Sequence, residues 1–135
     1  MNVLQITFLA VLACGGIAIA YTLLAKPTTG NAFLAAMLSA GLGAFTAVQI
    51  AQEGVMMFFI NHTHNLTGLQ VWWDLVMCVV IGLFLIAQRA RAAGMNLAPW
   101  FLFVGATASI GLLATCARLF WLESRTSTLA GTSAV

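Results

Sequence analysis

The chain has 135 residues, of which 62% are hydrophobic and only 6% are charged, and its mean hydropathy is +1.04. Soluble domains carry charge on about a quarter of their residues, so this composition excludes a soluble domain and predicts an integral membrane protein. The net charge of +2 is too small to indicate a nucleic-acid partner. No charged or Pro/Gly/Ser-rich linker divides the chain, which predicts one membrane domain over residues 1–135.

Four apolar segments are long enough to span a bilayer, which requires about twenty residues. The expected helices cover about residues 3–24, 32–60, 69–88 and 98–122, followed by a polar, frayed tail at 123–135. Pro27 and Gly30 separate the first two helices, and Gly54 is a candidate kink in the second. We therefore predict an all-α membrane protein with a four-transmembrane-helix bundle. No Lys or Arg precedes the first segment, and the segment stays apolar to Leu24. Both features favour a retained helix over a cleaved signal peptide.

The basic residues and tryptophans predict an orientation. Four spans would place both termini on the same side as loop 61–68, opposite Lys26, Arg89 and Arg91. Arg118 and Arg125 would lie on the terminal side. Because cytoplasmic loops are enriched in Lys and Arg, three residues against two favour termini and a loop on the outer, periplasmic side. The four tryptophans occur near the ends of the expected spans, as indoles do at membrane interfaces: Trp72, Trp73, Trp100 and Trp121.

Small residues along two of the expected spans predict close helix packing. The second span carries a ladder and the fourth a shorter set: Ala36, Ala40, Gly43, Ala47 and Ala51, then Thr107, Gly111, Ala114 and Thr115. These stripes indicate a tight bundle and do not by themselves indicate a ligand.

Three charged residues lie inside the expected spans on the side of the histidine loop. Counted from the outer ends of those spans, Glu53, Asp74 and Arg118 are about 10, 8 and 6 Å deep at 1.5 Å per residue. Charges at such depth need a partner or water. We therefore expect these three side chains to meet in one shallow layer.

Polar neighbours follow the same helical spacing. Gln49 precedes Glu53 by four residues, and Gln70 precedes Asp74 by four, so each pair shares a helix face. His62 and His64 lie in the connection that follows. The predicted site is a polar cup that opens outward and is lined by these residues and Arg118.

The cup allows several interpretations that the sequence leaves open. Arg118 could simply neutralise Asp74 or Glu53. A carboxyl whose pKa is raised by partial burial could donate a proton to an alkene or epoxide while the second carboxylate stabilises positive charge. The residues could instead bind a ligand without chemistry. A zinc-like set of His62, His64 and an acid lacks the helical His-Glu-x-x-His pattern, and three cysteines without a Cys-x-x-Cys motif add no ligand pattern, so we expect neither metal nor cofactor.

The second half of the chain resembles a bacterial family of small integral-membrane proteins of unknown function. The features that carry this likeness are Asp74-Leu75, the turn at 89–94, Trp100 and the step at 109–112 in "WWDLVMCVVIGLFLIAQRARAAGMNLAPWFLFVGATASIGLLATCARLFWLE". That family is distantly similar to plant membrane proteins needed for neoxanthin formation and to fungal membrane terpene cyclases that protonate an epoxide with paired acids. The resemblance implies a bacterial inner-membrane location and, if the chain is an enzyme, an acid role for Asp74 with Glu53 as its partner.

Three functions are compatible with these observations. Small size, packing stripes and the lack of a complete catalytic motif favour a non-catalytic membrane protein, either an accessory subunit or a component that binds lipid or isoprenoid in a larger inner-membrane complex. Its expected partners are membrane lipids and other integral-membrane subunits. An isoprenoid isomerase or cyclase that uses Asp74 and Glu53 is the alternative. A small multidrug/proton exchanger is a further alternative, although residues 3–24 lack the acid on which such exchangers rely.

Overall fold

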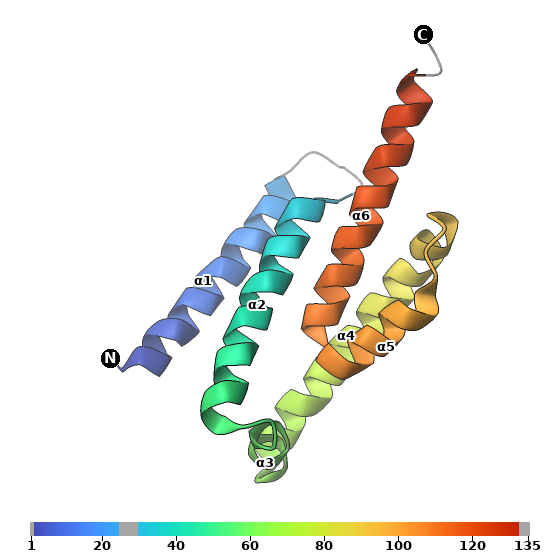
Figure 1. Ribbon diagram of the computed structural model, residues 1–135. Helices are drawn as coiled ribbons and strands as arrows, with labels where there is room; N and C mark the ends of the chain where they lie inside the picture. Colours follow the sequence, from blue (N-terminus) through green and yellow to red (C-terminus); the bar gives the residue numbers. More distant parts are fainter. Residues whose placement is uncertain (1, 25–29, 133–135) are drawn as a thin grey trace.

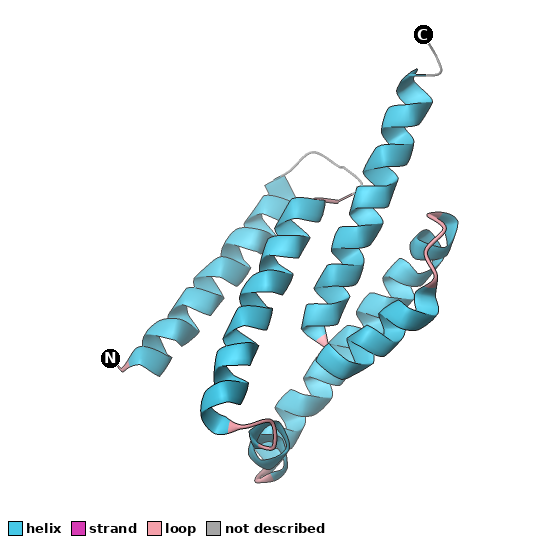
Figure 2. Cartoon of the chain, viewed as in Figure 1, coloured by secondary structure: helices cyan, strands magenta, loops and turns pink. Residues whose placement is uncertain are grey.

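The computed structural model describes residues 2–24 and 30–132, with side chains described up to Thr126 except at Thr22. Every regular element in these residues is a helix, as Figure 2 shows. In chain order the helices are α1 (Val3–Leu24), α2 (Ala32–Glu53), α3 (Met57–Thr63), α4 (Leu66–Ala92), α5 (Leu97–Thr107) and α6 (Ser109–Thr132). Lys26 and Pro27, used above as topology and helix-end signals, lie outside the described residues.

Among the described residues, three helices are long and apolar enough to cross a membrane: α1, α2 and α4. The starts of α2 and α4 are set by asparagine caps, since the Asn31 side chain accepts a hydrogen bond from Leu34 N and that of Asn65 accepts one from Gly68 N. Asn96 caps α5 in the same way. The predicted all-helical membrane class is therefore correct, and α4 extends beyond the expected range 69–88 at both ends.

The second expected span, residues 32–60, ends early at a glycine. Gly54 has φ +83°, a conformation that favours glycine, and its N–H donates to the carbonyl of Ile50 as the helix closes. The remaining residues form the separate seven-residue helix α3. The kink anticipated at Gly54 is thus a complete helix end.

The fourth expected span, residues 98–122, is wrong as a single helix. Ala108 interrupts it with φ 49° and ψ −116°, and the chain reverses there, so that α5 and α6 form a helical hairpin (Figure 1). The 11 residues of α5 are only about 16 Å long at 1.5 Å per residue, about half of the hydrocarbon thickness. The apolar sequence that looks long enough to span is folded back on itself, so the described residues contain three helices that are long and apolar enough to cross a membrane and do not confirm the expected four-span bundle.

The hairpin is held by close backbone packing at a small residue. A Cβ atom added at Gly111 of α6 would lie 2.7 Å from Val104 Cα and 2.8 Å from Val104 N of α5. Both residues are buried. Only a residue without a side chain permits this approach, so Gly111 defines where α6 crosses α5.

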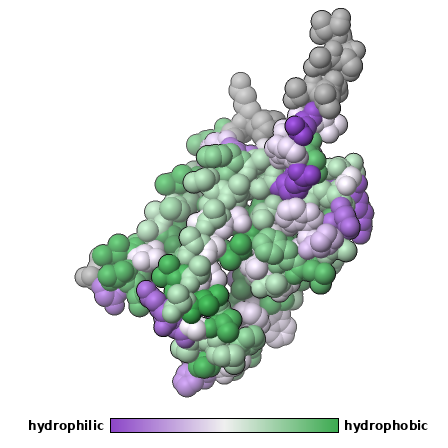
Figure 3. Space-filling view, in the orientation of Figure 1, coloured by the Kyte–Doolittle hydropathy of each residue, from purple (hydrophilic) through white to green (hydrophobic). Residues whose placement is uncertain are grey.

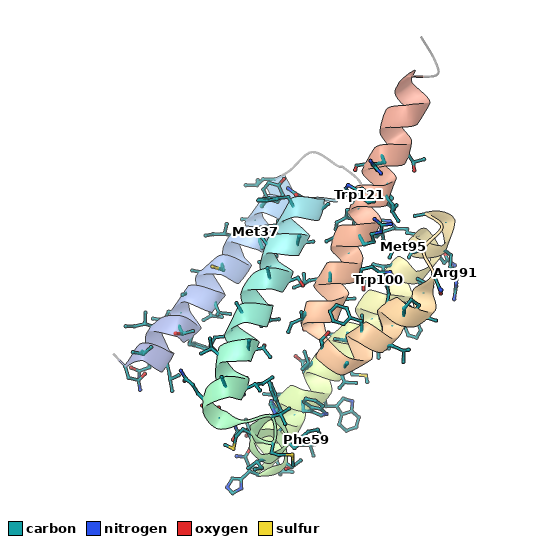
Figure 4. The ribbon with its side chains drawn as sticks, in the orientation of Figure 1. Met37, Phe59, Arg91, Met95, Trp100 and Trp121 are labelled. Atoms are coloured by element: carbon teal, nitrogen blue, oxygen red, sulfur yellow. The ribbon has the colours of Figure 1, made fainter. Side chains whose placement is uncertain are left out.

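Helix α6 is the centre of the fold. It packs on α2, α4 and α5, whereas α2 and α4 make at most marginal contact with each other. The buried cluster between α4, the α4–α5 turn and α6 consists of Ile86, Ala90, Met95 and Leu119. Trp100 packs on the edge of this cluster, and Figure 4 shows it together with Met95 beside α6.

The α2–α6 contact uses small residues, in a register that differs from the predicted ladder by one position. Ala35 and Ser39 are buried, and the Ser39 hydroxyl donates a 2.9 Å hydrogen bond to the carbonyl of Ile110. A Cβ atom at Gly43 would lie 3.8 Å from the Ile110 side chain. Of the predicted ladder only Gly43 faces α6, while Ala36 and Ala40 are exposed.

Reversal of the chain at Ala108 changes the relation between the two ends of the protein. Figure 1 shows the N-terminal end of α1 and the C-terminal end of α6 at opposite ends of the molecule. The ends of these two helices therefore do not lie together, as the expected shared side of both termini would require. The tail from 123 onward, expected to be frayed, continues α6 as helix as far as Thr132.

Candidate functional site

Polar residues gather at the two ends of the molecule. Figure 3 shows hydrophilic surface at both ends and an apolar belt between them. We call one end the histidine end; it comprises Glu53, α3 and residues 64–74. We call the other the arginine end; it contains Arg89, Arg91, Arg118, Glu123 and Arg125.

At the histidine end, the side chain of His62 in α3 packs against α4. Its Nδ1 is hydrogen-bonded to the carbonyl of Phe58 one turn earlier. Its ring centroid lies 5.3 Å from that of Trp72, with the planes tilted by 51°. This half-buried imidazole is therefore occupied in packing and in a local hydrogen bond, which is a structural role.

The connection from α3 to α4 is tight. His64 is the exposed C-cap of α3, and Asn65 follows at once as the N-cap of α4. A Cβ atom at Gly68 would lie 2.5 Å from the carbonyl oxygen of Asn61, so α3 presses directly on the first turn of α4. The predicted loop 61–68 is thus mostly helix, with a break of two residues.

The structure does not assemble the predicted acid pair. Glu53 ends α2 and Asp74 lies in the third turn of α4; both are exposed, and within the described residues neither carboxylate has a hydrogen-bond or ion-pair partner. Gln49 is half-buried and Gln70 is exposed. Because α2 packs on α6 and not on α4, the two acids lie on separate helices that share a depth without sharing a contact.

The described part of the chain contains no group of three or more His, Cys, Asp or Glu side chains that could hold an ion. His62 and His64 belong to one short helix and its cap, and nothing else in the described residues joins them as a third ligand.

Arg118 does not join the predicted cup. It lies near the C-terminal half of α6, five residues before Glu123, which is bound to Arg89 near the end of α4. Its guanidinium carbon lies 4.5 Å from the centroid of the Trp121 ring. The physical reason is the reversal at Ala108: α6 runs back toward the end of α4, and Arg118 is carried to the arginine end.

The Arg89–Glu123 pair is bidentate. Nε of Arg89 donates to Oε1 of Glu123 at 3.0 Å, and Nη2 donates to Oε2 at 2.7 Å. The guanidinium also lies 5.5 Å from the centroid of the Phe120 ring. Sequence reasoning missed this pair because it placed the two residues on opposite sides of the membrane.

A second group at the arginine end also went unpredicted. Arg118, Trp121 and Arg125 occur at i, i+3 and i+7 on α6, and therefore on one face. The Arg125 guanidinium carbon is 4.3 Å from the Trp121 centroid, so both guanidiniums contact the same indole. The spacing of the three residues is a signal in the sequence, but the interpretation of Arg118 as a partner for carboxylates obscured it.

Helices α1 and α2 leave an apolar groove between them. A cavity of about 350 Å³ is lined by residues of both helices and of the α2 cap: Cys14, Ile17, Ala18, Tyr21, Asn31, Phe33, Leu34 and Leu38. A 3.1 Å hydrogen bond from Asn31 Nδ2 to the Tyr21 hydroxyl joins two of the residues that line it. The groove has the size and polarity to take part of a lipid chain.

Comparisons with protein-family models, with curated proteins and with solved structures found no match. The family resemblance of the second half of the chain stays a prediction.

Proposed function

We propose that this protein is a non-catalytic accessory subunit of an inner-membrane assembly, and that a helix of a partner subunit packs on α1. The observation that carries the proposal is the exposure of the α1 side chains. None of the described side chains in this 22-residue helix is buried, and only Thr7 and Ala18 are half-buried. A helix that contributes so little to its own fold is available for packing against another chain.

The composition of α1 suits a helix partner. In membranes, helices associate where small residues let their backbones approach. A Cβ atom at Gly15 or Gly16 would meet nothing within 4 Å. The groove residues Cys14, Ile17, Ala18 and Tyr21 mark the face turned to α2, and by helical periodicity Gly16 lies on the other side. The outer face of α1 therefore offers a place for close helix contact.

The orientation we propose follows from the arginine end. Four described arginines gather there, and Lys26 falls in the connection between α1 and α2. By the positive-inside rule this end faces the cytoplasm, while α3 and the start of α1 face the periplasm. The outward histidine end agrees with the sequence-based expectation, and the C-terminus moves to the cytoplasmic side.

The test is affinity purification of the tagged chain in mild detergent, followed by mass spectrometry of bound proteins. The proposal expects a stoichiometric membrane partner with the unmodified chain and its loss with Gly16→Leu. Gly41→Leu is the matched control: Gly41 is an exposed glycine of α2 with no atom near its missing side chain, so the same substitution should retain the partner. Purification of the chain without any other protein would overturn the accessory role.

A further inference from the structure

A stripe of α6 at the arginine end carries charge that the protein itself does not neutralise. Arg118 and Arg125 are exposed, and within the described residues neither has a carboxylate partner. Arg89, by contrast, is bound to Glu123. Two cations without a carboxylate partner require either water or an anion from outside the chain.

Trp121 organises these two cations. Its indole is 38% exposed and has guanidinium carbons at 4.5 Å (Arg118) and 4.3 Å (Arg125) from its centroid. Stacking on an aromatic ring uses the flat face of a guanidinium and leaves its N–H edge free to donate hydrogen bonds. The ring therefore holds both donor groups on one face of α6 and lowers the conformational entropy lost when they bind a common anion.

The position of Trp121 between the two arginines favours a lipid phosphate as their anion. Arg118 and Arg125 are separated by about 10 Å along α6, with Trp121 between them. Tryptophan prefers the interface between headgroups and hydrocarbon. Arginine binds phosphate through two parallel N–H···O bonds, and a phosphodiester at the level of the indole can be reached from both sides.

We propose that Arg118, Trp121 and Arg125 form a binding site for the phosphate of an anionic phospholipid. A headgroup with net negative charge fits better than a zwitterionic one, because an ammonium group would be repelled by the guanidiniums of Arg118 and Arg125. The site lies on α6 and does not depend on a partner helix at α1. A negative result for the lipid site would therefore leave the accessory role unchanged, and the reverse also holds.

The experiment is native mass spectrometry of the purified full chain in detergent, titrated with phosphatidylglycerol or with phosphatidylcholine of the same acyl chains. We expect phosphatidylglycerol to bind about tenfold more tightly and Arg118→Gln or Arg125→Gln to remove about tenfold of that affinity. Arg91→Gln is the matched control: Arg91 is also exposed and at the same end, so its substitution removes the same charge and should change the affinity by no more than about twofold. Trp121→Leu keeps both charges and should weaken binding, which a purely electrostatic attraction would not.

Two results would overturn the site. Equal losses in Arg91→Gln and Arg118→Gln would mean that total charge, rather than this stripe, attracts the lipid. Displacement of bound phosphatidylglycerol by millimolar inorganic phosphate would mean that the residues bind a soluble anion instead. Arg125→Gln protects the test against misfolding, because Arg125 lies beyond the packed part of α6 and its removal leaves the buried cluster intact.

Discussion

Arg89 and Glu123 are 34 positions apart in the chain and are joined by two hydrogen bonds, of 3.0 and 2.7 Å. The pair ties the last turn of α4 to α6 and requires that both helices end on the same side of the protein. A continuous fourth span would carry Glu123 to the opposite side. The contact is thus compatible with the helical hairpin and incompatible with a continuous fourth span.

The first prediction concerns this pair. Arg89→Gln and Glu123→Gln should each lower the free energy of unfolding, and the coupling between them should be about 1 kcal/mol, because the geometry is bidentate but partly exposed. The double exchange Arg89→Glu with Glu123→Arg should recover part of the loss. Chemical unfolding in detergent, followed by circular dichroism, measures the unmodified chain, the two single Gln variants, their combination and the charge-swapped chain. Strictly additive single effects would contradict the contact.

The second prediction tests the crossing of α5 and α6. Gly111→Ala should lower the free energy of unfolding by about 1–3 kcal/mol, because the new Cβ would collide with the backbone of Val104. Gly105→Ala is the control on α5: its Cβ meets nothing within 4 Å, and alanine should be neutral or should stabilise the helix by up to about 1 kcal/mol. A smaller loss at Gly111 than at Gly105 would argue against the hairpin.

The third prediction uses the backbone at the hairpin tip. Ala108 has φ 49°, which glycine adopts without strain, so Ala108→Gly should raise the free energy of unfolding by about 1 kcal/mol. Ala106→Gly, two residues earlier within α5, should lower it by about 0.5–1 kcal/mol because glycine weakens a regular helix. The opposite signs, measured by the same unfolding assay, distinguish a reversal at Ala108 from an uninterrupted helix, in which both substitutions would destabilise.

The fourth prediction tests the register of α2 on α6. Ala35→Leu should disrupt the helix contact and lower the free energy of unfolding by about 1–3 kcal/mol, because Ala35 is buried. Ala36→Leu introduces the same side chain one position on, at an exposed site, and should be tolerated within about 0.5 kcal/mol. Thermal unfolding in detergent separates the two. Equal sensitivity would mean that the predicted ladder, rather than the adjacent face, contacts α6.

The fifth prediction concerns topology. In a background in which Cys14, Cys78 and Cys116 are replaced by alanine, a cysteine at His64 and one at Thr126 should be labelled from opposite sides of the membrane. An impermeant maleimide applied to spheroplasts should modify His64→Cys, whereas Thr126→Cys should react only after the membrane is opened. Labelling of both positions in intact spheroplasts would restore the shared side that four continuous spans require.

Much of the architecture follows from composition and local signals. Apolar length alone identifies α1, α2 and α4 as membrane-crossing candidates. Asparagine caps and Gly54 set helix ends through hydrogen bonds and backbone conformation that belong to neighbouring residues. Such features are readable because their causes lie within a few positions of each other in the chain.

What the sequence could not supply is the reversal at Ala108. No proline or glycine occupies that position, and the flanking sequence is mostly apolar apart from Thr107 and Ser109, so local rules predict an unbroken helix. The turn is stabilised by contacts between distant segments: Gly111 against Val104, Ser39 against Ile110, and Arg89 against Glu123.

The reversal at Ala108 also explains why the residues of the predicted site do not meet. Hydropathy and helical periodicity correctly put Glu53 and Asp74 near one end, yet the partner assigned to them, Arg118, belongs to the other. Depth along a helix depends on the direction in which that helix runs, and this direction is decided by tertiary packing. Sequence by itself therefore determined a helical membrane protein with charges near its ends, while the folded structure decided which charges meet.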